Sequence, residues 1–503
     1  MRYHSLYATL EVQGDLEPLA WADDGIENGR ILMAVQHKFK PFWAVQYHPE
    51  SIQTDSSGVR IIQNFWRLAQ MWTSKSNRRL MSWSQSATGT FGYPWSGLHR
   101  AKSYPVSTPG LRVLSKNVRL SHLNMAVVCE LFGASDESSP FVLLDSAATP
   151  GRYSILACLS SNSLKISYHL NESVVRLTQN GSTTLENLHG RDMWTWLSDF
   201  MRKKQASIGP HDSPFWGGLI GTLSYELGVQ TTLDIRAQPS LHPDVNLVFV
   251  ERSVVVDVAT QKVFVQSLID DDDSWIVETI SKLLLLPSSK PYNAVAAISA
   301  ESVLDLPERS RYINRIHHAM DHLHAGDSYE LCLTTQAYVK TARHSSWERY
   351  KSLRQKNPAP FSAYIRLDPT TLLSSSPERF LSFSRPPKSV CQLRPIKGTV
   401  HKDQCPSFAD AQQALVGSTK EVAENLMIVD LIRHDLHGVV GENVQVTQFC
   451  GVEEYETVYQ LVSVIEGKLP ESLVSTTTEE QLGWEVLKRS LPPGMLSPMC
   501  LTS

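Results

Sequence analysis

The order of short β-type runs and longer helical patterns after residue 110 most constrains the fold of this chain. FVLLDSA at 141–147 and RSVVVDV at 252–258 have the β-branched composition of strands, whereas YINRIHHAMDHLHAG at 312–326 has helical periodicity. Strands and helices are mixed here without the regular β-α alternation of a doubly wound sheet. The pattern therefore predicts an α+β fold.

The first 72 residues carry a separate pattern. ILMAVQ at 31–36 and FWAVQY at 42–47, joined by the polar turn HKFKP, predict a β-hairpin, and SGVRIIQNFWRLAQMW at 57–72 predicts a helix. The Ser-, Gly- and Trp-rich residues 73–110 predict a linker. A loop-like stretch, LPSSKPYN at 286–293, predicts a further boundary. The domains that we expect are residues 1–72, 73–110, 111–290 and 291–503.

The composition describes a globular protein and excludes nucleic acid and membranes as expected partners. Hydrophobic residues make up 42% of the 503 positions, charged residues 19%, and the net charge is −4, so there is no basic excess. The longest aliphatic run, Leu283 to Leu286, is far too short to span a bilayer. The acidic residues Asp270 to Asp273 are expected to form a solvated loop.

Seven cysteines lie between Cys129 and Cys500 without any C-x-x-C pair. This spacing supports neither a disulfide framework nor a zinc site. The first residues, MRYHSLYATLEVQG, lack the charged and apolar regions of a signal peptide. Together these features predict a reducing, cytoplasmic setting.

His48 and Glu50 in VQYHPES are candidates for the base and its orienting carboxylate in a nucleophilic triad. For an isolated H-x-E, a surface His–Glu pair is the simpler alternative. Together with RYHSL at 2–6 and the predicted hairpin, the motif resembles the last third of class I glutamine amidotransferases. The resemblance implies that both residues serve a cysteine in an upstream G-x-C-x-G turn. No cysteine precedes Cys129, so we expect a truncated domain, or one that a complementing amidotransferase chain completes.

A long helix is predicted from GSTKEVAENLMIVDLIRHDLHG at 417–438. Ser418 and Glu421 form a capping box at its start, and Gly438 is the expected stop. Glu424 lies one turn after Glu421 and borders the apolar stripe of this helix. Its carboxylate is therefore expected to lie near a cleft.

Six stretches resemble chorismate-utilising enzymes, in the same order and at fitting distances. PFWGGLIGTLSYELG at 214–228 lacks the spacing of a nucleotide loop and by itself indicates close packing of strands. GDSYELCLTTQ at 326–336 and ENLMIVDLIRHDL at 424–436 are similar to the aminodeoxychorismate synthases of that family. The six stretches are 143–157, 214–228, 312–336, 374–380, 394–399 and 421–467. The resemblance covers most of 118–494 and implies amination of chorismate, with glutamine or ammonia, to 4-amino-4-deoxychorismate in the p-aminobenzoate branch of folate synthesis.

Lys397 in QLRPIKGTV is the most specific candidate. Taken alone, a lysine before Gly-Thr is a turn charge, since an amine becomes nucleophilic only when desolvation or a neighbouring cation lowers its pKa. Anthranilate and isochorismate synthases have P-I-A-G-T here, whereas aminodeoxychorismate synthases have P-I-K-G-T. The resemblance implies that Lys397 attacks C2 of chorismate while the C4 hydroxyl leaves. Ammonia then adds at C4 and releases the lysine.

Two glutamates complete the implied site. Glu378 in SSSPERF follows a strand and a Pro-fixed turn, and the resemblance gives it acid-base work on the leaving hydroxyl. A salt bridge to Arg379 is the alternative. The resemblance implies that Glu424 is a Mg²⁺ ligand. A single glutamate can serve in this way, because Mg²⁺ needs only one or two carboxylates beside substrate oxygens and water. An ion pair with a neighbouring cation is the alternative for Glu424.

The resemblance adds Gly398, Thr399 and Gln460 as substrate-binding candidates and Ser146 as the candidate for a regulatory aromatic amino-acid site. Gln460 stands where anthranilate synthase-like members have His, and Gln cannot shuttle a proton, which disfavours anthranilate chemistry. The match ends at Gly494, so the chorismate-binding region is expected to be incomplete. The alternative functions are anthranilate synthesis and a non-catalytic fragment that binds a partner.

Overall fold

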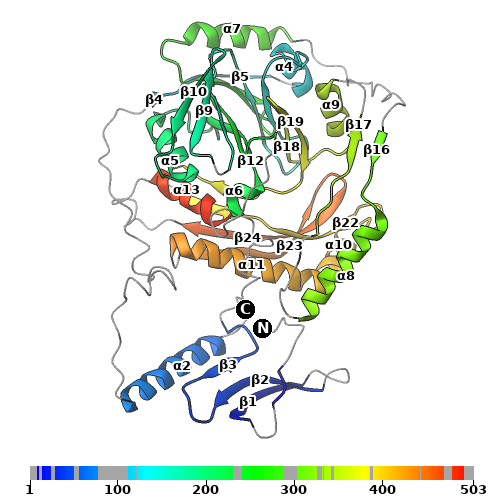
Figure 1. The fold of residues 1–503 in the computed structure, drawn as a ribbon. Helices are drawn as coiled ribbons and strands as arrows, with labels where there is room; N and C mark the ends of the chain where they lie inside the picture. Colours follow the sequence, from blue (N-terminus) through cyan, green and yellow to red (C-terminus); the bar gives the residue numbers. More distant parts are fainter. Residues whose placement is uncertain are drawn as a thin grey trace. The chain divides into compact units, whose positions relative to one another are not determined.

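In the computed structural model, contacts within the chain define two units, and each is described by itself (Figure 1). The smaller unit takes in residues 1–103, 308–335 and 498–503, and the larger unit takes in 104–307 and 336–497. The domain boundaries expected from the sequence stay predictions. The structure describes residues 8–10, 14–23, 29–49, 56–76, 111–120, 123–170, 172–229, 241–286, 303–325, 331, 333–340, 345–385, 389–441, 443–468 and 479–491.

The smaller unit contains a three-stranded antiparallel sheet in the order β1-β2-β3, followed by helix α2. The Trp43 ring of β3 meets the Phe65 ring of α2 edge-on, with centroids 6.0 Å apart. The predicted hairpin and helix are confirmed, although α2 continues three residues into the predicted linker. The linker residues 77–110 lie outside the described part. The bounds are Leu16–Asp23 for β1, Arg30–His37 for β2, Trp43–Val45 for β3 and Ser56–Lys75 for α2.

Helix α8 (Arg309–Ala325) also belongs to the smaller unit and confirms the helical pattern predicted for this stretch. None of its residues is buried. The Arg315 guanidinium donates a hydrogen bond to the backbone oxygen of Thr334 at 3.1 Å. This contact holds the chain after α8 beside the middle of the helix.

The larger unit contains a seven-stranded antiparallel sheet in the order β19-β18-β6-β7-β14-β15-β5. Its buried cluster is rich in rings, with Trp347 stacked on Tyr350 at 5.6 Å and both close to Tyr364. Such pairs each add about 0.5–1.5 kcal/mol beyond the area they bury. The strands are β5 (Leu114–Arg119), β6 (Phe141–Asp145), β7 (Tyr153–Ala157), β14 (Arg252–Asp257), β15 (Lys262–Ser267), β18 (Phe361–Leu367) and β19 (Thr370–Ser376).

A second antiparallel sheet has the order β10-β9-β8-β13-β12. Gly221 of β12 lies so close to β13 that a Cβ atom there would stand 2.0 Å from the Asn246 backbone oxygen. Close packing of strands, as predicted for residues 214–228, therefore accounts for this glycine. The strands are β8 (Lys165–Tyr168), β9 (Val174–Gln179), β10 (Ser182–Asn187), β12 (Gly218–Leu223) and β13 (Val245–Val250).

A third sheet carries the predicted site. It has the order β20-β21-β24-β22, and β23 also pairs with β24. Helices α10 and α11 pack against β22, β23 and β24, and Figure 1 shows α11 along one face of this sheet. The elements are β20 (Leu381–Phe383), β21 (Val390–Leu393), β22 (Ile396–His401), α10 (Phe408–Val416), α11 (Thr419–Val440), β23 (Val444–Glu454) and β24 (Val458–Lys468).

The remaining described elements surround these sheets. Helix α13 packs against α5 and α11. The mixture of sheets and helices confirms the predicted α+β fold. The elements are β4 (Leu111–Arg112), α4 (Met125–Leu131), α5 (Met193–Lys203), β11 (Ala206–Ile208), α6 (Tyr225–Val229), α7 (Asp273–Leu284), β16 (Val303–Asp305), β17 (Tyr338–Lys340), α9 (Ser346–Lys356) and α13 (Glu479–Arg489).

The start of α11 follows the prediction and its end does not. The Ser418 hydroxyl accepts a hydrogen bond from the Glu421 N–H at 3.3 Å, which confirms the N-cap. The predicted stop at Gly438 is wrong, because the helix continues to Val440. Gly441, with φ of 66°, ends it in the left-handed region that suits glycine.

The expectation of a solvated acidic loop is wrong for Asp272. This residue is 6% exposed, and its carboxylate accepts hydrogen bonds from Arg252 and from the Ser267 hydroxyl, each at 2.6 Å. Burial acts to raise the pKa of Asp272, but these hydrogen bonds outweigh burial and hold the pKa below its usual range. Asp272 is therefore part of a buried ion pair.

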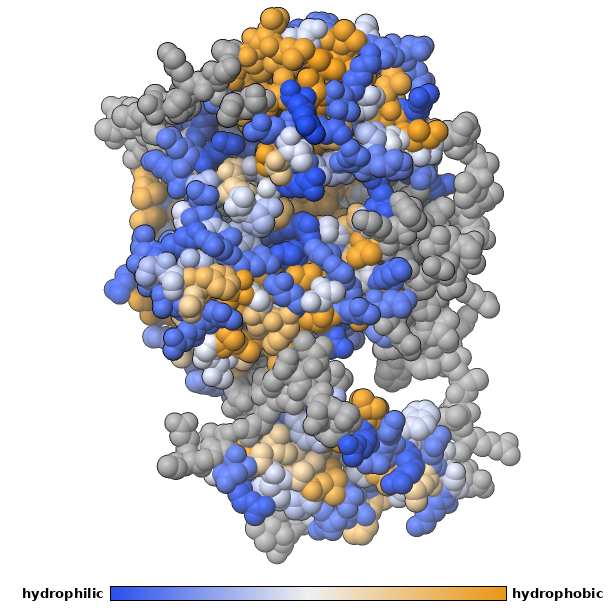
Figure 2. Space-filling view, turned by 180° about the vertical axis from the view of Figure 1, so that it is seen from behind, coloured by the Kyte–Doolittle hydropathy of each residue, from blue (hydrophilic) through white to orange (hydrophobic). Residues whose placement is uncertain are grey.

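Apolar surface gathers at the upper end of the larger unit in Figure 2, the end at which Figure 1 places α7. Val277 and Leu284 of this helix, and Leu285 after it, are exposed. Among the described residues, no helix combines the length and the apolar character that crossing a membrane requires.

Candidate active site

Lys397 lies in a β-bulge at the start of β22. Ile396 pairs with Val462 of β24 and Thr399 pairs with Gln460, so β22 has one more residue than β24 over this interval. A bulge of this kind turns side chains away from the regular alternation of a strand. Lys397, the predicted nucleophile, therefore lies in a β-bulge of the sheet and not in a loop.

Gly398 meets two structural demands of this bulge. Its φ of 83° lies in the region that favours glycine. A Cβ atom at this position would also stand 3.1 Å from both Glu421 Oε2 and Leu415 Cδ2. The Gly-Thr pair after Lys397 thus sets the local backbone and brings Glu421 of α11 against the bulge.

Glu378 lies beside the lysine strand. Its Oε1 accepts a hydrogen bond from the Ile396 N–H at 3.4 Å, which joins the turn after β19 to the first residue of β22. Glu378 is exposed as a whole residue, yet partial desolvation of its carboxyl raises the pKa of Glu378, and the Ile396 N–H and the charge of Lys397 oppose part of the rise. The structure therefore brings Glu378 and Lys397 together, as the resemblance implied, while their catalytic roles stay predictions.

Arg379, the alternative partner of Glu378, makes other contacts. Its guanidinium donates to Gln392, and its Nε is buried without a hydrogen-bond partner. Burial and the nearby charge of Arg394 lower the pKa of Arg379. Arg394 itself pairs with Glu453 at 2.5 Å. These contacts leave the Glu378 carboxyl oriented by Ile396.

Thr399 and Gln460 are brought together by the β22–β24 register. Gln460 Nε2 donates to Thr399 Oγ1 at 3.2 Å. Gln460 is 5% exposed, and its Oε1 is buried with no partner. A buried acceptor without a partner costs about 1–3 kcal/mol, so this oxygen is a candidate acceptor for a bound ligand.

Glu424 lies on α11, one turn after Lys420. The two side chains form an exposed ion pair at 3.7 Å, which is the alternative that the sequence offered for this residue. Among the described residues, no group of three or more His, Cys, Asp and Glu could hold a metal ion. Glu424 therefore does not belong to a cage of protein ligands within the described residues, and its role as a Mg²⁺ ligand stays a prediction.

Glu421 is a neighbour of the site that sequence reasoning assigned only to helix capping. Its side chain lies against Gly398, next to Lys397. The signal in the sequence was its spacing of three residues from Glu424, which places both carboxylates on neighbouring positions of α11. Local spacing could not show that Glu421 faces the bulge, because β22 precedes the helix by a long connection.

Ser146 is fixed at the end of β6. Its hydroxyl donates to the Tyr153 backbone oxygen at 2.7 Å, and its N–H donates to Ser154 Oγ at 3.0 Å. A cavity of about 180 Å³ lies between Pro150, in the loop after Ser146, and Ile396 of the lysine strand. A regulatory role for Ser146 stays a prediction.

The predicted amidotransferase pair is described only in part. His48 is partly buried and follows β3 by three residues. Glu50 lies outside the described residues, so its geometry beside His48 stays a prediction. The sequence before Cys129 supplies no thiol for the pair.

Comparison with known families agrees with this fold. Residues 140–498 match the family described as chorismate binding enzyme, and residues 1–68 match glutamine amidotransferase class I. Anthranilate synthase component I from Streptococcus pneumoniae has a similar fold, with a TM-score of 0.54 and 22% identity over 69% of this chain and 74% of that chain. Together these features define a chorismate-binding enzyme joined to an amidotransferase segment.

Within this class, the chain belongs to the aminodeoxychorismate synthase family. It is 33% identical to the aminodeoxychorismate synthase of Saccharomyces cerevisiae, over 99% of this chain and 67% of that protein. It is also 33% identical to the aminodeoxychorismate synthase of Streptomyces griseus, over 94% of this chain and 64% of that protein. The family resemblance predicted from the motifs is confirmed, and the chain spans about two thirds of the length of these relatives.

Proposed function

We propose that this chain aminates chorismate to 4-amino-4-deoxychorismate in the p-aminobenzoate branch of folate synthesis. The observation that carries the proposal is the placement of Lys397 in the β22 bulge, next to the Glu378 carboxyl. A nucleophile and an acid side by side can act on two carbons of one small ring. The names of the relatives support chorismate as the substrate.

In the first step, the Lys397 ammonium group loses its proton to solvent, and its Nζ then forms a bond to C2 of chorismate. The ring double bonds shift and the C4–O bond breaks. The Glu378 carboxyl gives its proton to the leaving hydroxyl, which departs as water. The raised pKa of Glu378 supports this role, because a general acid must retain its proton close to neutral pH.

In the second step, ammonia forms a bond to C4. The double bonds shift back, the Nζ–C2 bond breaks, and the lysine leaves as an amine that regains its proton from solvent. The Glu378 carboxylate takes up the proton that the new ammonium group loses. The balance is chorismate and ammonia to 4-amino-4-deoxychorismate and water, and both Lys397 and Glu378 return to their starting states.

Four nearby residues are proposed to position the substrate. Gln460 Oε1 is a buried acceptor available to a substrate hydroxyl or to ammonia. Thr399 orients Gln460 through its hydroxyl, and Gly398 keeps the bulge open. Glu424 would hold Mg²⁺, which when bound supplies positive charge for the substrate carboxylates.

For glutamine as nitrogen source, we propose that a complementing amidotransferase chain provides the cysteine nucleophile and that His48 and Glu50 serve it. The exposed apolar residues Phe65, Trp66 and Met71 of α2 support a partner on this segment. The free thiols of the described cysteines suit a cytoplasmic setting. With this chain alone, ammonia is the expected nitrogen donor.

Anthranilate synthesis is the enzymatic alternative, and a non-catalytic binding fragment is the other. The similarity to the Streptococcus pneumoniae structure extends to the fold alone. A lysine in the bulge favours attack at C2 by the protein, which directs nitrogen to C4. In anthranilate chemistry, nitrogen enters at C2 instead.

The test is incubation of the purified chain with chorismate, ammonium and Mg²⁺, followed by chromatography of the products. We expect aminodeoxychorismate, and Lys397→Ala should lower its formation by at least ~100-fold. Lys402→Ala is the matched control directly after the same strand, because Lys402 pairs with Glu454 at the surface. Anthranilate as the main product, or full activity of Lys397→Ala, would contradict the proposal. Chorismate binding without turnover would favour the binding fragment.

A further inference from the structure

A histidine-rich tract, HHAMDHLH at 317–324, lies near the end of α8 and has no part in the proposed reaction. Four of its eight residues are histidines. His318 and His322 are one turn apart on the same side of the helix. Their rings meet at a centroid distance of 4.8 Å and an angle of 70°, and both residues are exposed. The two imidazoles therefore stand side by side where solvent ions reach them.

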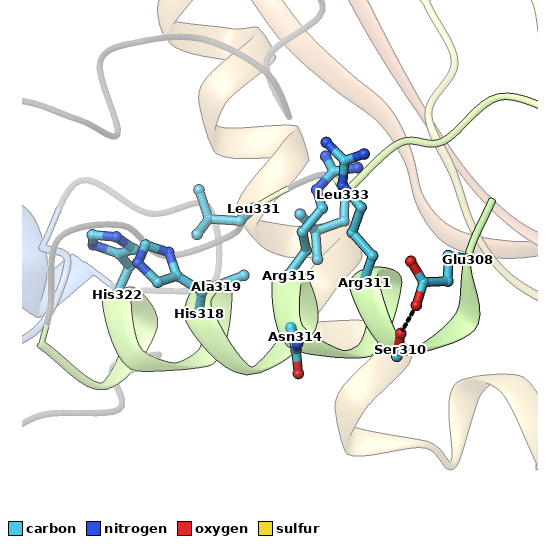
Figure 3. A pocket seen from close by; sticks show the side chains of 10 residues that line it. All are labelled: Glu308, Ser310, Arg311, Asn314, Arg315, His318, Ala319, His322, Leu331 and Leu333. Atoms are coloured by element: carbon cyan, nitrogen blue, oxygen red, sulfur yellow. Dashed lines mark hydrogen bonds between the residues drawn. The ribbon is translucent and has the colours of Figure 1, made fainter.

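These rings line one end of a groove of about 650 Å³ on α8. Figure 3 shows the guanidinium groups of Arg311 and Arg315 near Leu333, away from the two rings. Arg315 is held there by its hydrogen bond to the Thr334 backbone oxygen. The side chain of Asn314 points away from the rings in the same view. The end of the groove at the two histidines is thus separated from its cationic end.

We propose that His318 and His322 form a binding site for a divalent transition-metal ion such as Cu²⁺, Ni²⁺ or Zn²⁺. Two histidines four residues apart on a helix can bind one ion through one nitrogen each. Metal–nitrogen bonds of about 2.0–2.1 Å are short enough to join rings at this spacing after small side-chain rotations. Imidazole suits these ions, whereas Mg²⁺ prefers oxygen ligands. The site is independent of the proposed amination of chorismate.

Water completes the coordination in this proposal. Across the described ranges, no group of three or more His, Cys, Asp and Glu forms a metal site. With two imidazoles and water as the ligands, the affinity of the site for divalent ions should follow their general order for nitrogen ligands, with Cu²⁺ bound most tightly.

The alternative is that the rings merely pack edge to face. His317 and His324, in the same tract, provide the matched control. They are seven residues apart, a rise of about 10 Å along the helix, so they cannot share one ion. Replacing them removes the same number of histidines from α8 without disturbing the His318–His322 pair.

The experiment is titration of the untagged 503-residue chain with NiCl₂, monitored by isothermal calorimetry and repeated with CuCl₂, ZnCl₂ and MgCl₂. Loss of one ligand removes the chelate advantage, so His318→Ala and His322→Ala should each weaken Ni²⁺ binding by at least ~10-fold. The His317→Ala/His324→Ala double variant should stay within about twofold of the parent. Because none of α8 is buried, circular dichroism should show that all variants keep the parent fold.

Unchanged Ni²⁺ affinity in the His318→Ala/His322→Ala double variant would overturn the proposal. An equal loss in the control double variant would overturn it too, since the tract would then act by its histidine content alone. Binding of MgCl₂ at these residues would exclude a nitrogen-ligand site. Activity with ammonia should be the same in every variant, so the outcome does not depend on whether the amination proposal holds.

Discussion

The Ile396 N–H donates a hydrogen bond to Glu378 Oε1 at 3.4 Å. The Glu378 carboxyl therefore contacts the backbone of the residue that directly precedes Lys397. This contact joins the turn after β19 in the seven-stranded sheet to the first residue of β22 in the site sheet. The position of Glu378 relative to Lys397 therefore depends on how these two sheets pack together. The proposed acid and nucleophile roles of the two residues both rest on this one junction.

Glu378→Gln should lower the rate of amination by about 10²–10⁴-fold, because an amide cannot act as a general acid. With free ammonia held constant, the parent pH profile should contain a falling limb at the raised pKa of Glu378, since the proton-donating form is lost there, and Glu378→Gln should lack this limb. Rates with chorismate measured from about pH 5 to 9 test this sign. A flat profile in the parent would contradict the acid role.

The same pKa shift has a consequence for stability. A carboxyl whose pKa is raised by folding stabilises the protein below its unfolded pKa, and this contribution is lost as pH rises through the folded value. Glu378→Gln should therefore raise Tm relative to the parent near pH 8 and have less effect near pH 4. Equal changes in Tm at pH 8 and at pH 4 would contradict the raised pKa of Glu378.

Gly398→Ala should destabilise the chain by about 1–3 kcal/mol, because its φ of 83° is strained for other residues and the new Cβ would crowd Glu421 and Leu415. Gly438→Ala is the matched control. That glycine is helical with open space around it, so alanine there should stabilise by about 0.5–1 kcal/mol. Urea denaturation measures both, and equal effects would rule out a special role for the bulge.

Gln460→Met should separate binding from stability. The change removes a hydrogen bond to Thr399 but also removes the buried oxygen that has no partner, so the free energy of unfolding should change by less than about 1 kcal/mol. The kcat/KM for chorismate should fall by about 10-fold or more if Oε1 accepts from the substrate or ammonia. An unchanged kcat/KM would show that this oxygen has no such role.

Thr399→Val is the companion to that variant. It leaves Gln460 Nε2 buried without its acceptor, and an orphaned donor costs about 1–3 kcal/mol. Denaturation should therefore show a larger loss of stability for Thr399→Val than for Gln460→Met. The reverse order would contradict the assigned hydrogen bond.

Local chemistry made part of the fold predictable from sequence. The Ser418 cap and the hairpin of β2 and β3 depend on neighbouring residues, and both were found where their patterns indicated. The end of α11 was misplaced because Gly438 is tolerated inside a packed helix. Nothing local distinguishes it from Gly441, where the backbone actually turns.

Long-range contacts explain what sequence reasoning missed. Thr399 and Gln460 are 61 residues apart and meet only through the register of β22 on β24. The spacing of Ser418 and Glu421 indicated only a helix cap. The periodicity of a helix does not show which strand the helix faces, so the contact of Glu421 with Gly398 was missed. Lys397 and Glu378 were found through the family motifs, and their own surroundings alone would have left both as surface charges.

Asp272 is the last such case and offers a test by pH. Its partner Arg252 lies 20 residues away, across the β14–β15 hairpin. Because hydrogen bonding holds the pKa of Asp272 low despite burial, its contribution to stability is present above the unfolded pKa of about 3.9 and is lost as pH falls through the lower folded value. Asp272→Asn should cost about 1–3 kcal/mol at pH 7.

That cost should shrink as the pH of urea denaturation is lowered toward about 3, because the parent carboxylate also becomes protonated there. Asp270→Asn is the control in the same acidic stretch. Asp270 is exposed, so its replacement should change the free energy of unfolding by no more than about 0.5 kcal/mol at any pH. If both variants behaved alike, Asp272 would be a solvated loop residue, as the sequence alone suggested, and the Arg252 pair would contribute nothing measurable.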